Sequence, residues 1–185
     1  RKQETWQVFE ELEKYPGSGW FKLGDKDLAL HLFRTGAISE GKRLTEVTGE
    51  ISAFLGITQT VLPMCDQPVE TIVLTDDGEM AFQEYFVKHQ WQPKVTGFRF
   101  DGIEGATISQ EICDALQDAD LIVIAPSNPW VSIGPILGVP GMRTLLIDKP
   151  VIAVSPIIYG QAVKGPAAKM YEELGIKPCA FAVAE

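Results

Sequence analysis

The chain has 185 residues, which is enough for one domain of ordinary size or for one core with a small appendage. Apolar residues make up 45% and charged residues 22% of the sequence, and these values suggest neither a disordered chain nor a membrane protein. The net charge of −9 argues against nonspecific binding to nucleic acid, which requires Lys and Arg side chains against phosphates. The longest apolar runs, such as "LIVIA", have the length of a strand, so no membrane span is expected.

The three cysteines, Cys65, Cys113 and Cys179, lie far apart and show no C-x-x-C spacing. This pattern predicts neither a disulfide framework nor a zinc site, and it favours a reduced, cytoplasmic compartment. The first residue is not Met, no signal-peptide pattern follows it, and the ending "CAFAVAE" looks like a further strand. We therefore expect a segment of a longer protein.

The first third of the chain has the apolar spacing of helices. The pattern predicts helices over 5–14 and 25–39, and a third helix that begins at Thr45 as N-cap and ends before Gly56 as the C′ residue. We expect residues 1–57 to form a small helical subdomain.

The remaining residues, 58–185, have the pattern of an α/β protein. A turn at "DDG" (76–78) between two β-rich runs predicts a hairpin, and "KVTGFRFDG" predicts another strand. From residue 109, with Ser109 as a helix N-cap, helical and strand patterns alternate, and a helix is expected near 134–146. This order indicates parallel strands joined by helices, so we predict a Rossmann-like, mostly parallel sheet with a β-hairpin excursion.

Two strand–loop–helix units leave a buried strand through Ser and Pro and enter a helix through Gly-Pro, with Pro135 and Pro166 as the expected N1 residues. Because the carboxyl ends of parallel strands and helix N-termini attract anionic ligands, the first unit predicts a phosphate or nucleotide site. The alternative is that Ser and Asn only cap turns and helices. The candidate nucleotide-binding residues are Pro126, Ser127, Asn128, Pro129, Ser132, Gly134, Ser155 and Lys164.

A second concentration of polar residues lies in "WFKLGDKDLALHLFRT". Asp27, His31 and Arg34 have i, i+4, i+7 spacing and share one helix face, where they could bind a polar ligand or orient a proton-transfer group. A solvated polar face with capping aspartates is the simpler interpretation. Lys22, ahead of this helix, is either a ligand contact or a surface lysine.

A third candidate is the loop "LPMCDQPVET", where Asp66 could reach a metal or a hydroxyl or could make an Asx-turn. The aromatic residues Phe82, Tyr85, Phe86 and Trp91 are interpreted as core or sheet-face residues. The two histidines have no partner spacing that would indicate a metal site.

Several motifs, taken together and in order, resemble a known family. They are "WFKLGDKDLALHLFRT", "LTEVTGEI", "LPMCDQPVET", "FQEYFV", "APSNPWVSIGPILGVPGMR", "VIAVSPIIYGQAVKGPAAKM" and "LGIKPCAFAVA". They look like the 2-phospho-L-lactate transferase family of coenzyme F-420 biosynthesis, over nearly the whole chain. The resemblance implies transfer of a phospholactyl or phosphoenolpyruvyl group from a guanylylated donor to the deazaflavin FO, with release of GMP and a requirement for Mg²⁺.

The resemblance also implies roles for residues that match the family motifs. Lys22, Asp25, Lys26 and Asp27 would lie on the acceptor side, although the family more often has Arg where Lys26 stands. The loop that begins at Ser127 would bind the donor nucleotide. The candidate substrate-binding set, which combines these residues with those of the helix face and of the Asp66 loop, is Lys22, Asp25, Lys26, Asp27, His31, Arg34, Met64 and Asp66.

The loop at Asp66 departs from the family pattern, because Cys65 replaces a hydroxyl and Gln67 replaces a carboxylate. No metal ligand is therefore assigned in this chain, and no catalytic residue is named. The family's glycine-rich first strand and its metal-binding aspartates do not match any part of the sequence. The resemblance further implies a homodimer.

Two other functions are compatible with these patterns. One is a non-catalytic regulator of the related gluconeogenesis-factor type, which binds nucleotides or nucleotide sugars but carries a Gly-Ser-Leu-Tyr-type loop at the position of Ser127–Pro129. The other is a stable fragment without activity of its own. The "GDKD" and "SNP" motifs favour the transferase.

Overall fold

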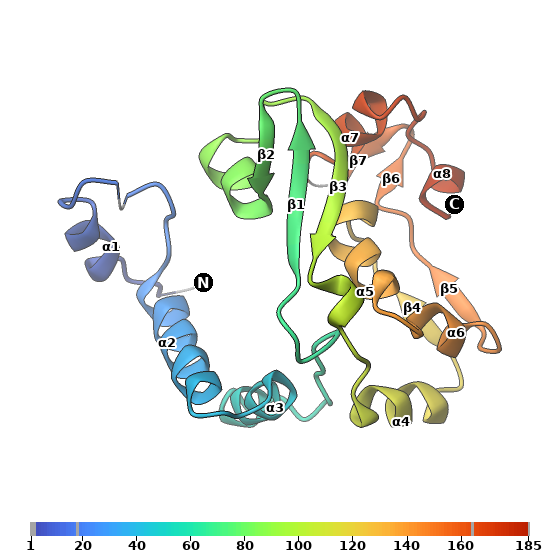
Figure 1. Ribbon diagram of the computed structural model, residues 1–185, viewed down its shortest axis with the longest axis horizontal. Coiled ribbons are helices and arrows are strands. Elements are labelled where there is room, and N and C mark those ends of the chain that lie inside the picture. The colour runs from blue at the N-terminus through green and yellow to red at the C-terminus, as the bar shows by residue number, and fades with distance from the viewer. Residues whose placement is uncertain (1–2, 18, 164, 185) are drawn as a thin grey trace. The chain divides into compact units, whose positions relative to one another are not determined.

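The computed structural model describes residues 3–17, 19–163 and 165–184, and these form two compact units (Figure 1). Unit 1 is Arg1–Pro63 and unit 2 is Met64–Glu185. The division falls a few residues after the boundary expected at residue 57. None of the described helices is long and apolar enough to cross a membrane.

Unit 1 is helical and consists of α1 (Gln7–Leu12), α2 (Asp25–Ser39) and α3 (Leu44–Phe54). The expected helix over 25–39 is confirmed residue for residue. The predicted N-cap of α3 was wrong, because Arg43 occupies that position and its N–H donates to the Glu46 carboxylate at 2.8 Å, while Thr45 is buried inside the helix. Gly56 has a φ of +69° directly after the helix, as expected for a C′ glycine.

Unit 2 combines an antiparallel sheet with a parallel pair of strands. Strands β2, β1 and β3 form the antiparallel sheet in that order, and the predicted hairpin at residues 76–78 joins β1 to β2. Strands β4 and β5 pair in parallel, so the α/β class is confirmed. The elements in chain order are β1 (Glu70–Thr75), β2 (Gly78–Ala81), η1 (Glu84–Lys88), β3 (Val95–Asp101), η2 (Ile103–Gly105), α4 (Gln110–Asp118), β4 (Ile122–Ile124), η3 (Pro129–Ile133), α5 (Gly134–Gly138), α6 (Met142–Leu146), β5 (Val151–Ala153), β6 (Ile157–Ile158), β7 (Gln161–Ala162), α7 (Ala167–Glu173) and α8 (Ala180–Ala184).

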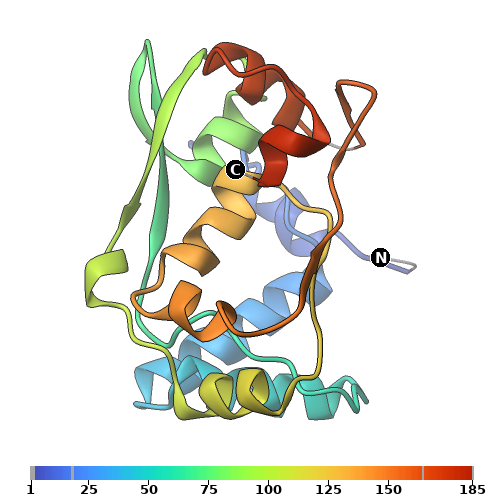
Figure 2. The same cartoon turned by 90° about the vertical axis from the view of Figure 1, so that its right-hand side faces the viewer.

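Two local predictions for unit 2 were wrong, and a third was confirmed in its bounds. The helix expected near 134–146 begins with α5 at Gly134 and ends with α6 at Leu146, but it is interrupted between them at Gly141, whose φ is +87°, and the π-helix η3 runs directly into its start. Figure 2 shows η3 and α5 as one helical stretch beside the antiparallel sheet. The second of the two β-rich runs, which extends to "FQEYFV", is a strand only as far as Ala81, and the π-helix η1 follows it. The ending "CAFAVAE" contains the helix α8, since three of its seven residues are alanine, which has the highest helix propensity.

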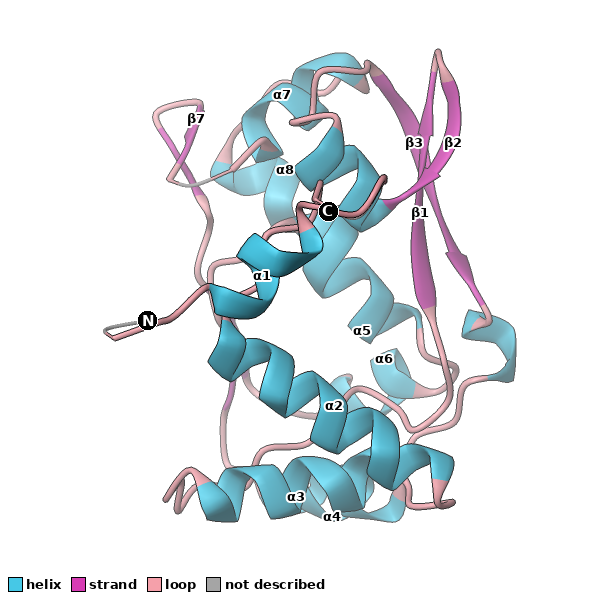
Figure 3. Cartoon of the chain, turned by 90° about the vertical axis from the view of Figure 1, so that its left-hand side faces the viewer, coloured by secondary structure: helices cyan, strands magenta, loops and turns pink. Residues whose placement is uncertain are grey.

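The main core of unit 2 lies between the antiparallel sheet and α7 (Figure 3). Val73, Tyr85, Val95 and Met170 are all fully buried there. Helix α7 is also tied to the start of β3, because the Glu173 carboxylate accepts a hydrogen bond from the Val95 N–H at 3.0 Å. This core fixes η1 and η3 beside each other, since aromatic residues of both pack against it.

Candidate functional site

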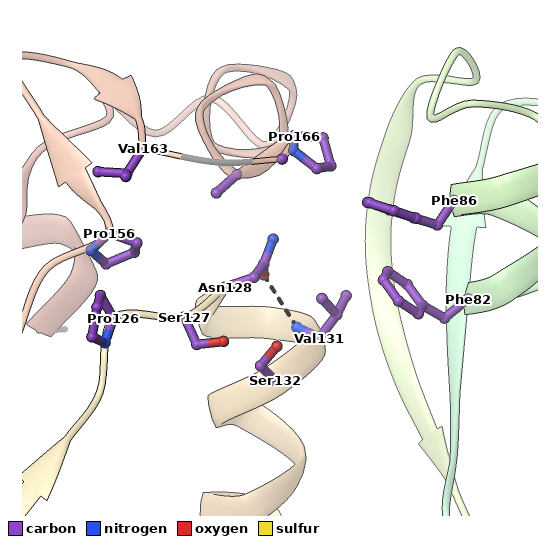
Figure 4. A pocket seen from close by; sticks show the side chains of 12 residues that line it. Phe82, Phe86, Pro126, Ser127, Asn128, Val131, Ser132, Pro156, Val163 and Pro166 are labelled. Atoms are coloured by element: carbon purple, nitrogen blue, oxygen red, sulfur yellow. Dashed lines mark hydrogen bonds between the residues drawn. The ribbon is translucent and has the colours of Figure 1, made fainter. Parts of the chain in front are cut away.

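A pocket of about 320 Å³ lies in unit 2 where the parallel strands end (Figure 4). Pro126 follows the carboxyl end of β4 and Pro156 follows that of β5, which is the edge where open α/β sheets bind ligands. The residues that line it are Phe82, Phe86, Pro126, Ser127, Asn128, Val131, Ser132, Pro156, Val163, Gly165, Pro166 and Ala167.

The floor of the pocket is formed by Ser127, Asn128 and Ser132. The Asn128 carboxamide oxygen accepts hydrogen bonds from the N–H groups of Trp130 at 3.0 Å and Val131 at 3.2 Å, so Asn128 is the N-cap of η3. Among the described residues, neither the Ser127 nor the Ser132 hydroxyl has a hydrogen-bond partner, and both point into the space of the pocket (Figure 4). These two hydroxyls are therefore available to a ligand.

The π-helical geometry of η3 has a local cause. The N–H of Ile133 donates to the carbonyl of Asn128 at 3.1 Å, which is an i to i+5 bond. Pro135 has no N–H, so the carbonyl of Val131 lacks the partner that a regular helix would provide. The wide turn places Val131 and Ser132 on the same side of the helix as the cap.

The opposite wall of the pocket is aromatic. The rings of Phe82 and Phe86 lie 5.4 Å apart, and Trp91 packs behind Phe86 at 5.2 Å between ring centroids. Tyr85 lies between them in sequence but points into the core, where its hydroxyl donates to the Trp91 carbonyl at 3.4 Å. Burial, with a smaller contribution from Glu173, raises the pKa of Tyr85 to about 12, so this hydroxyl stays protonated.

The structure brings together four of the predicted nucleotide-binding residues, Pro126, Ser127, Asn128 and Ser132. Pro129 and Gly134 line a neighbouring cavity of about 600 Å³ on the other side of the helix. Gly134 is closely packed, because a Cβ atom there would lie 2.9 Å from the carbonyl oxygen of Pro129 and 3.2 Å from the ring of Phe100.

Of the other two members of that set, the structure describes only Ser155. The hydroxyl of Ser155 accepts from the N–H of Ile157 at 3.0 Å and donates to its carbonyl at 3.1 Å, so it stabilises a local turn. Pro166, the expected N1 residue, is the N-cap of α7, and Pro135 is the second residue of α5. Lys164 lies outside the described residues.

In unit 1, the predicted acceptor-side residues at the start of α2 contact the segment around α1. The Asp25 carboxylate accepts hydrogen bonds from the N–H groups of Gln7 and Val8, both at 3.1 Å. In return, the Glu4 carboxylate accepts from the N–H of Lys26 at 2.9 Å. A hydrogen bond from the Thr5 side chain, followed by these backbone bonds, lowers the pKa of Asp25.

Lys22, His31 and Arg34 also have partners within unit 1. The Lys22 ammonium lies 4.7 Å from the ring centroid of Trp6 and 5.5 Å from that of Phe9. Arg34 Nη2 is 2.6 Å from His31 Nδ1, which makes Nδ1 the acceptor and leaves the proton of a neutral imidazole on Nε2. Asp27 lies on the same helix, in its first turn.

Cys65 and Gln67 hold the loop that contains Met64 and Asp66. Cys65 is buried, and burial raises the pKa of its thiol. The Gln67 carboxamide forms two hydrogen bonds with Thr107, at 2.9 Å to the hydroxyl and at 3.0 Å from the N–H. The residues that replace the commoner Ser and Asp therefore anchor the loop, while Met64 and Asp66 stay half-buried.

No group of three or more His, Cys, Asp and Glu side chains in the described ranges could hold a metal ion. No ligand role was predicted for Phe82 and Phe86, which were interpreted as core or sheet-face residues. Their i, i+4 spacing, with Tyr85 between them, is the signal of a helix face that could have identified them.

The fold and the pocket define an α/β protein of the Rossmann-like class with a ligand pocket at the carboxyl ends of parallel strands. The family model described as 2-phospho-L-lactate transferase CofD matches residues 2–184. The chain belongs to this family.

Known relatives agree with the assignment. The 2-phospho-L-lactate transferase of Methanosarcina mazei is 40% identical over 182 residues, which are 98% of this chain and 60% of the relative. The phosphoenolpyruvate transferase of Mycobacterium leprae is 39% identical over 193 residues, which cover 100% of this chain and 58% of the relative. The chain thus spans about 60% of the length of these relatives.

The crystal structure of a UPF0052-family protein from Bacillus halodurans superimposes with a TM-score of 0.54 at 20% identity. The match covers 78% of this chain and 45% of that protein. This likeness shows that the two proteins share a fold.

Proposed function

We propose that the protein transfers a phospholactyl or phosphoenolpyruvyl group from a guanylylated donor to the deazaflavin FO and releases GMP. The observation that carries this proposal is the pocket at the ends of β4 and β5, in a chain that matches the transferase family over almost its full length. The relatives named for phospholactate and for phosphoenolpyruvate are similarly identical to this chain, so both three-carbon acids remain candidates.

In the proposed reaction, a hydroxyl oxygen of the acceptor forms a bond to the phosphorus that carries the three-carbon acid. The bond from this phosphorus to the oxygen of GMP breaks, GMP leaves with the electron pair, and the hydroxyl proton passes to solvent or to a base. This reaction requires little covalent chemistry from the protein. The protein therefore contributes mainly by aligning the two substrates and by stabilising negative charge.

Within unit 2, the Ser127 and Ser132 hydroxyls are the groups that could donate hydrogen bonds to the donor's phosphates. Asn128 holds the turn that places both of them. Magnesium belongs to the proposed activity as well, and no step is assigned to it. No catalytic acid or base is assigned.

A direct test is a titration of FO, followed by its own fluorescence, in the presence and absence of GDP and Mg²⁺. It uses this 185-residue chain in parallel with the complete product of the gene that encodes it. We expect saturable FO binding, and transfer activity from a guanylylated donor in at least the complete gene product.

A nucleotide sugar such as UDP-N-acetylglucosamine serves as the competing ligand. Binding of the nucleotide sugar without binding or turnover of FO by either form would contradict the transferase and support the regulator. The test therefore separates the two functions that share this fold.

The cellular setting is also proposed. We expect a cytoplasmic enzyme that acts as a homodimer and does not bind nucleic acid. Light scattering coupled to size-exclusion chromatography measures the mass of the assembly directly, and a monomeric mass in the active enzyme would contradict the dimer.

A further inference from the structure

The second cavity of unit 2, which lies on the other side of the helix η3, has no role in the proposed transfer reaction. Its volume is about 600 Å³, and its walls come from β3, from η3 and α5, and from α7 and α8. Cavities of this size and with mainly apolar walls are typical of binding sites for small molecules. The side chains around it therefore indicate which class of molecule would fit.

One wall of this cavity is a row of three aromatic rings. The ring of Trp130 stacks on that of Phe98, with 5.7 Å between the centroids and 15° between the planes, and Tyr171 lies 4.3 Å from Trp130 on this row. Tyr171 is buried, and its hydroxyl donates a hydrogen bond to the Ala182 carbonyl at 3.1 Å. Because these rings are held in place by the fold, a flat apolar ligand gains contact area and ring–ring attraction while little side-chain freedom is lost.

The charge at this cavity comes from one residue. Arg143 is the only charged side chain among the described residues that line it. Arg143 is exposed, and no hydrogen bond or ion pair joins its side chain to another described residue. The other arginines that the structure describes, Arg34, Arg43 and Arg99, each have a partner within the chain. The planar guanidinium of Arg143 can therefore form two parallel hydrogen bonds with the carboxylate of a ligand.

We propose that this cavity binds a small organic acid, with a flat apolar body against Phe98 and Trp130 and a single carboxylate at Arg143. A phosphate ester is the less suitable occupant, because it carries up to two negative charges and the described lining offers one cation. The proposal goes beyond the transfer reaction and does not depend on it, since the cavity is separate from the pocket at the ends of β4 and β5.

The test uses 2-naphthoate, which has two fused rings and one carboxylate, and 2-naphthamide, which has a similar shape and no charge. Isothermal titration calorimetry measures the dissociation constants of both compounds in the complete gene product and in the 185-residue chain. Arg143→Gln removes the positive charge. Lys94→Gln is the matched control, since Lys94 is also exposed in unit 2 but does not line the cavity. The melting temperature of each variant shows whether it is folded.

We expect saturable binding of 2-naphthoate to the complete gene product, with a dissociation constant of about 1 mM or lower. Arg143→Gln should weaken this binding about three- to tenfold, whereas 2-naphthamide should bind equally to Arg143→Gln and to the wild type. Lys94→Gln should bind 2-naphthoate like the wild type. An equal loss in both variants would reveal only a general effect of charge and would overturn the proposal. Absence of binding to the complete gene product overturns it too, even if the 185-residue chain binds.

A second pair of variants tests where the ring system of the probe lies. Phe98→Leu removes one ring from the row, and Phe86→Leu removes one ring from the other pocket. We expect Phe98→Leu to weaken the binding of both compounds about three- to tenfold and Phe86→Leu to leave it unchanged. The reverse result would place the probe in the pocket at the ends of β4 and β5 and overturn the proposal. Neither FO nor GDP is used, so these outcomes are independent of the test of the transfer reaction.

Discussion

Two helix starts in this protein look alike in sequence and differ in structure. The start of α2 carries Asp25, Lys26 and Asp27, and the start of η3 carries Ser127 and Asn128. At α2, the N–H of Lys26 is satisfied by Glu4, and the Asp25 carboxylate is used to hold α1. At η3, Asn128 satisfies the first N–H groups, but the neighbouring hydroxyls stay open to a pocket.

The difference shows that polar residues at a helix start do not by themselves indicate a ligand. At α2 the polar groups find partners within 25 residues of chain, and a ligand would have to compete with them. At η3 the side chain of Asn128 alone caps the helix. The proline-rich segment that follows β4 borders a pocket beside this cap. The following predictions test this contrast, from the largest expected effect to the smallest.

Gly134→Ala should lower the free energy of unfolding by about 1–3 kcal/mol, because the new Cβ would lie too close to the Pro129 carbonyl and the Phe100 ring. Gly36→Ala in α2 is the matched control, since nothing lies within 4 Å of a Cβ there, and we expect it to raise stability by about 0.5–1 kcal/mol. Urea unfolding measures both. A stable Gly134→Ala variant that loses GDP binding would instead make Gly134 a ligand contact.

Asn128→Ala should cost about 1–2 kcal/mol of stability, because two N–H groups lose their acceptor. It should also weaken GDP binding by more than about tenfold, which is about 1.4 kcal/mol. Asn128→Asp keeps the accepting oxygen and should retain the stability. If Asn128→Ala is destabilised but binds GDP normally, Asn128 is only a cap, and η3 resembles α2 more closely than proposed.

Lys22→Ala should raise the apparent KM for FO and leave GDP affinity unchanged, as the family resemblance implies. The structure adds a competing role, because the ammonium lies over Trp6, a contact that contributes about 0.5–1 kcal/mol at exposed sites. Lys22→Arg keeps both the charge and the ring contact and serves as the control. A normal FO titration for Lys22→Ala would restrict this residue to its structural contact.

The Asp25 contact should weaken in acid. Its pKa is lowered in the folded state, so the ionised carboxylate contributes stability above the ordinary aspartate pKa of about 4, and this contribution is lost as the pH falls through the lower folded value. Hydrogen exchange at the amides of Gln7 and Val8 measures it directly. Protection of these amides that does not change between neutral and strongly acidic pH, after correction for the intrinsic rates, would contradict the role of Asp25.

His31→Ala should have the smallest effect on turnover. It removes the acceptor of one Arg34 hydrogen bond, which contributes about 0.5–1.5 kcal/mol. We therefore expect the melting temperature to change more than the turnover of FO. A variant with wild-type melting and reduced turnover would assign His31 to the substrate side, and the start of α2 would then be a ligand site after all.

The sequence predicted the elements whose signals are local. Helix α2, the hairpin at residues 76–78 and the Ser109 cap of α4 were all identified from spacing and turn residues, because these signals depend on neighbours in the chain. The pocket floor was predicted in the same way, from the position of Ser127 after a strand.

What the sequence could not predict depends on contacts between distant segments. Phe82 and Phe86 face the pocket only because Tyr85 and Met170 meet in the core, and these two residues are far apart in the chain. The π-turn of η3 depends on the combination of the Asn128 cap with Pro135, which no single propensity describes. The close packing of Gly134 against Phe100 also depends on the fold, because the two residues are far apart in the chain.

The burial of Cys65 has a practical consequence for experiments on this protein. Its pKa is raised by burial, so the group stays a thiol and reacts slowly with alkylating reagents, whereas Cys113 and Cys179 are only half-buried. Mass spectrometry after brief alkylation should therefore find Cys65 unlabelled in a folded chain and labelled once the loop beside Thr107 opens. The number of labelled thiols therefore shows, for each variant and without any ligand, whether unit 2 is folded.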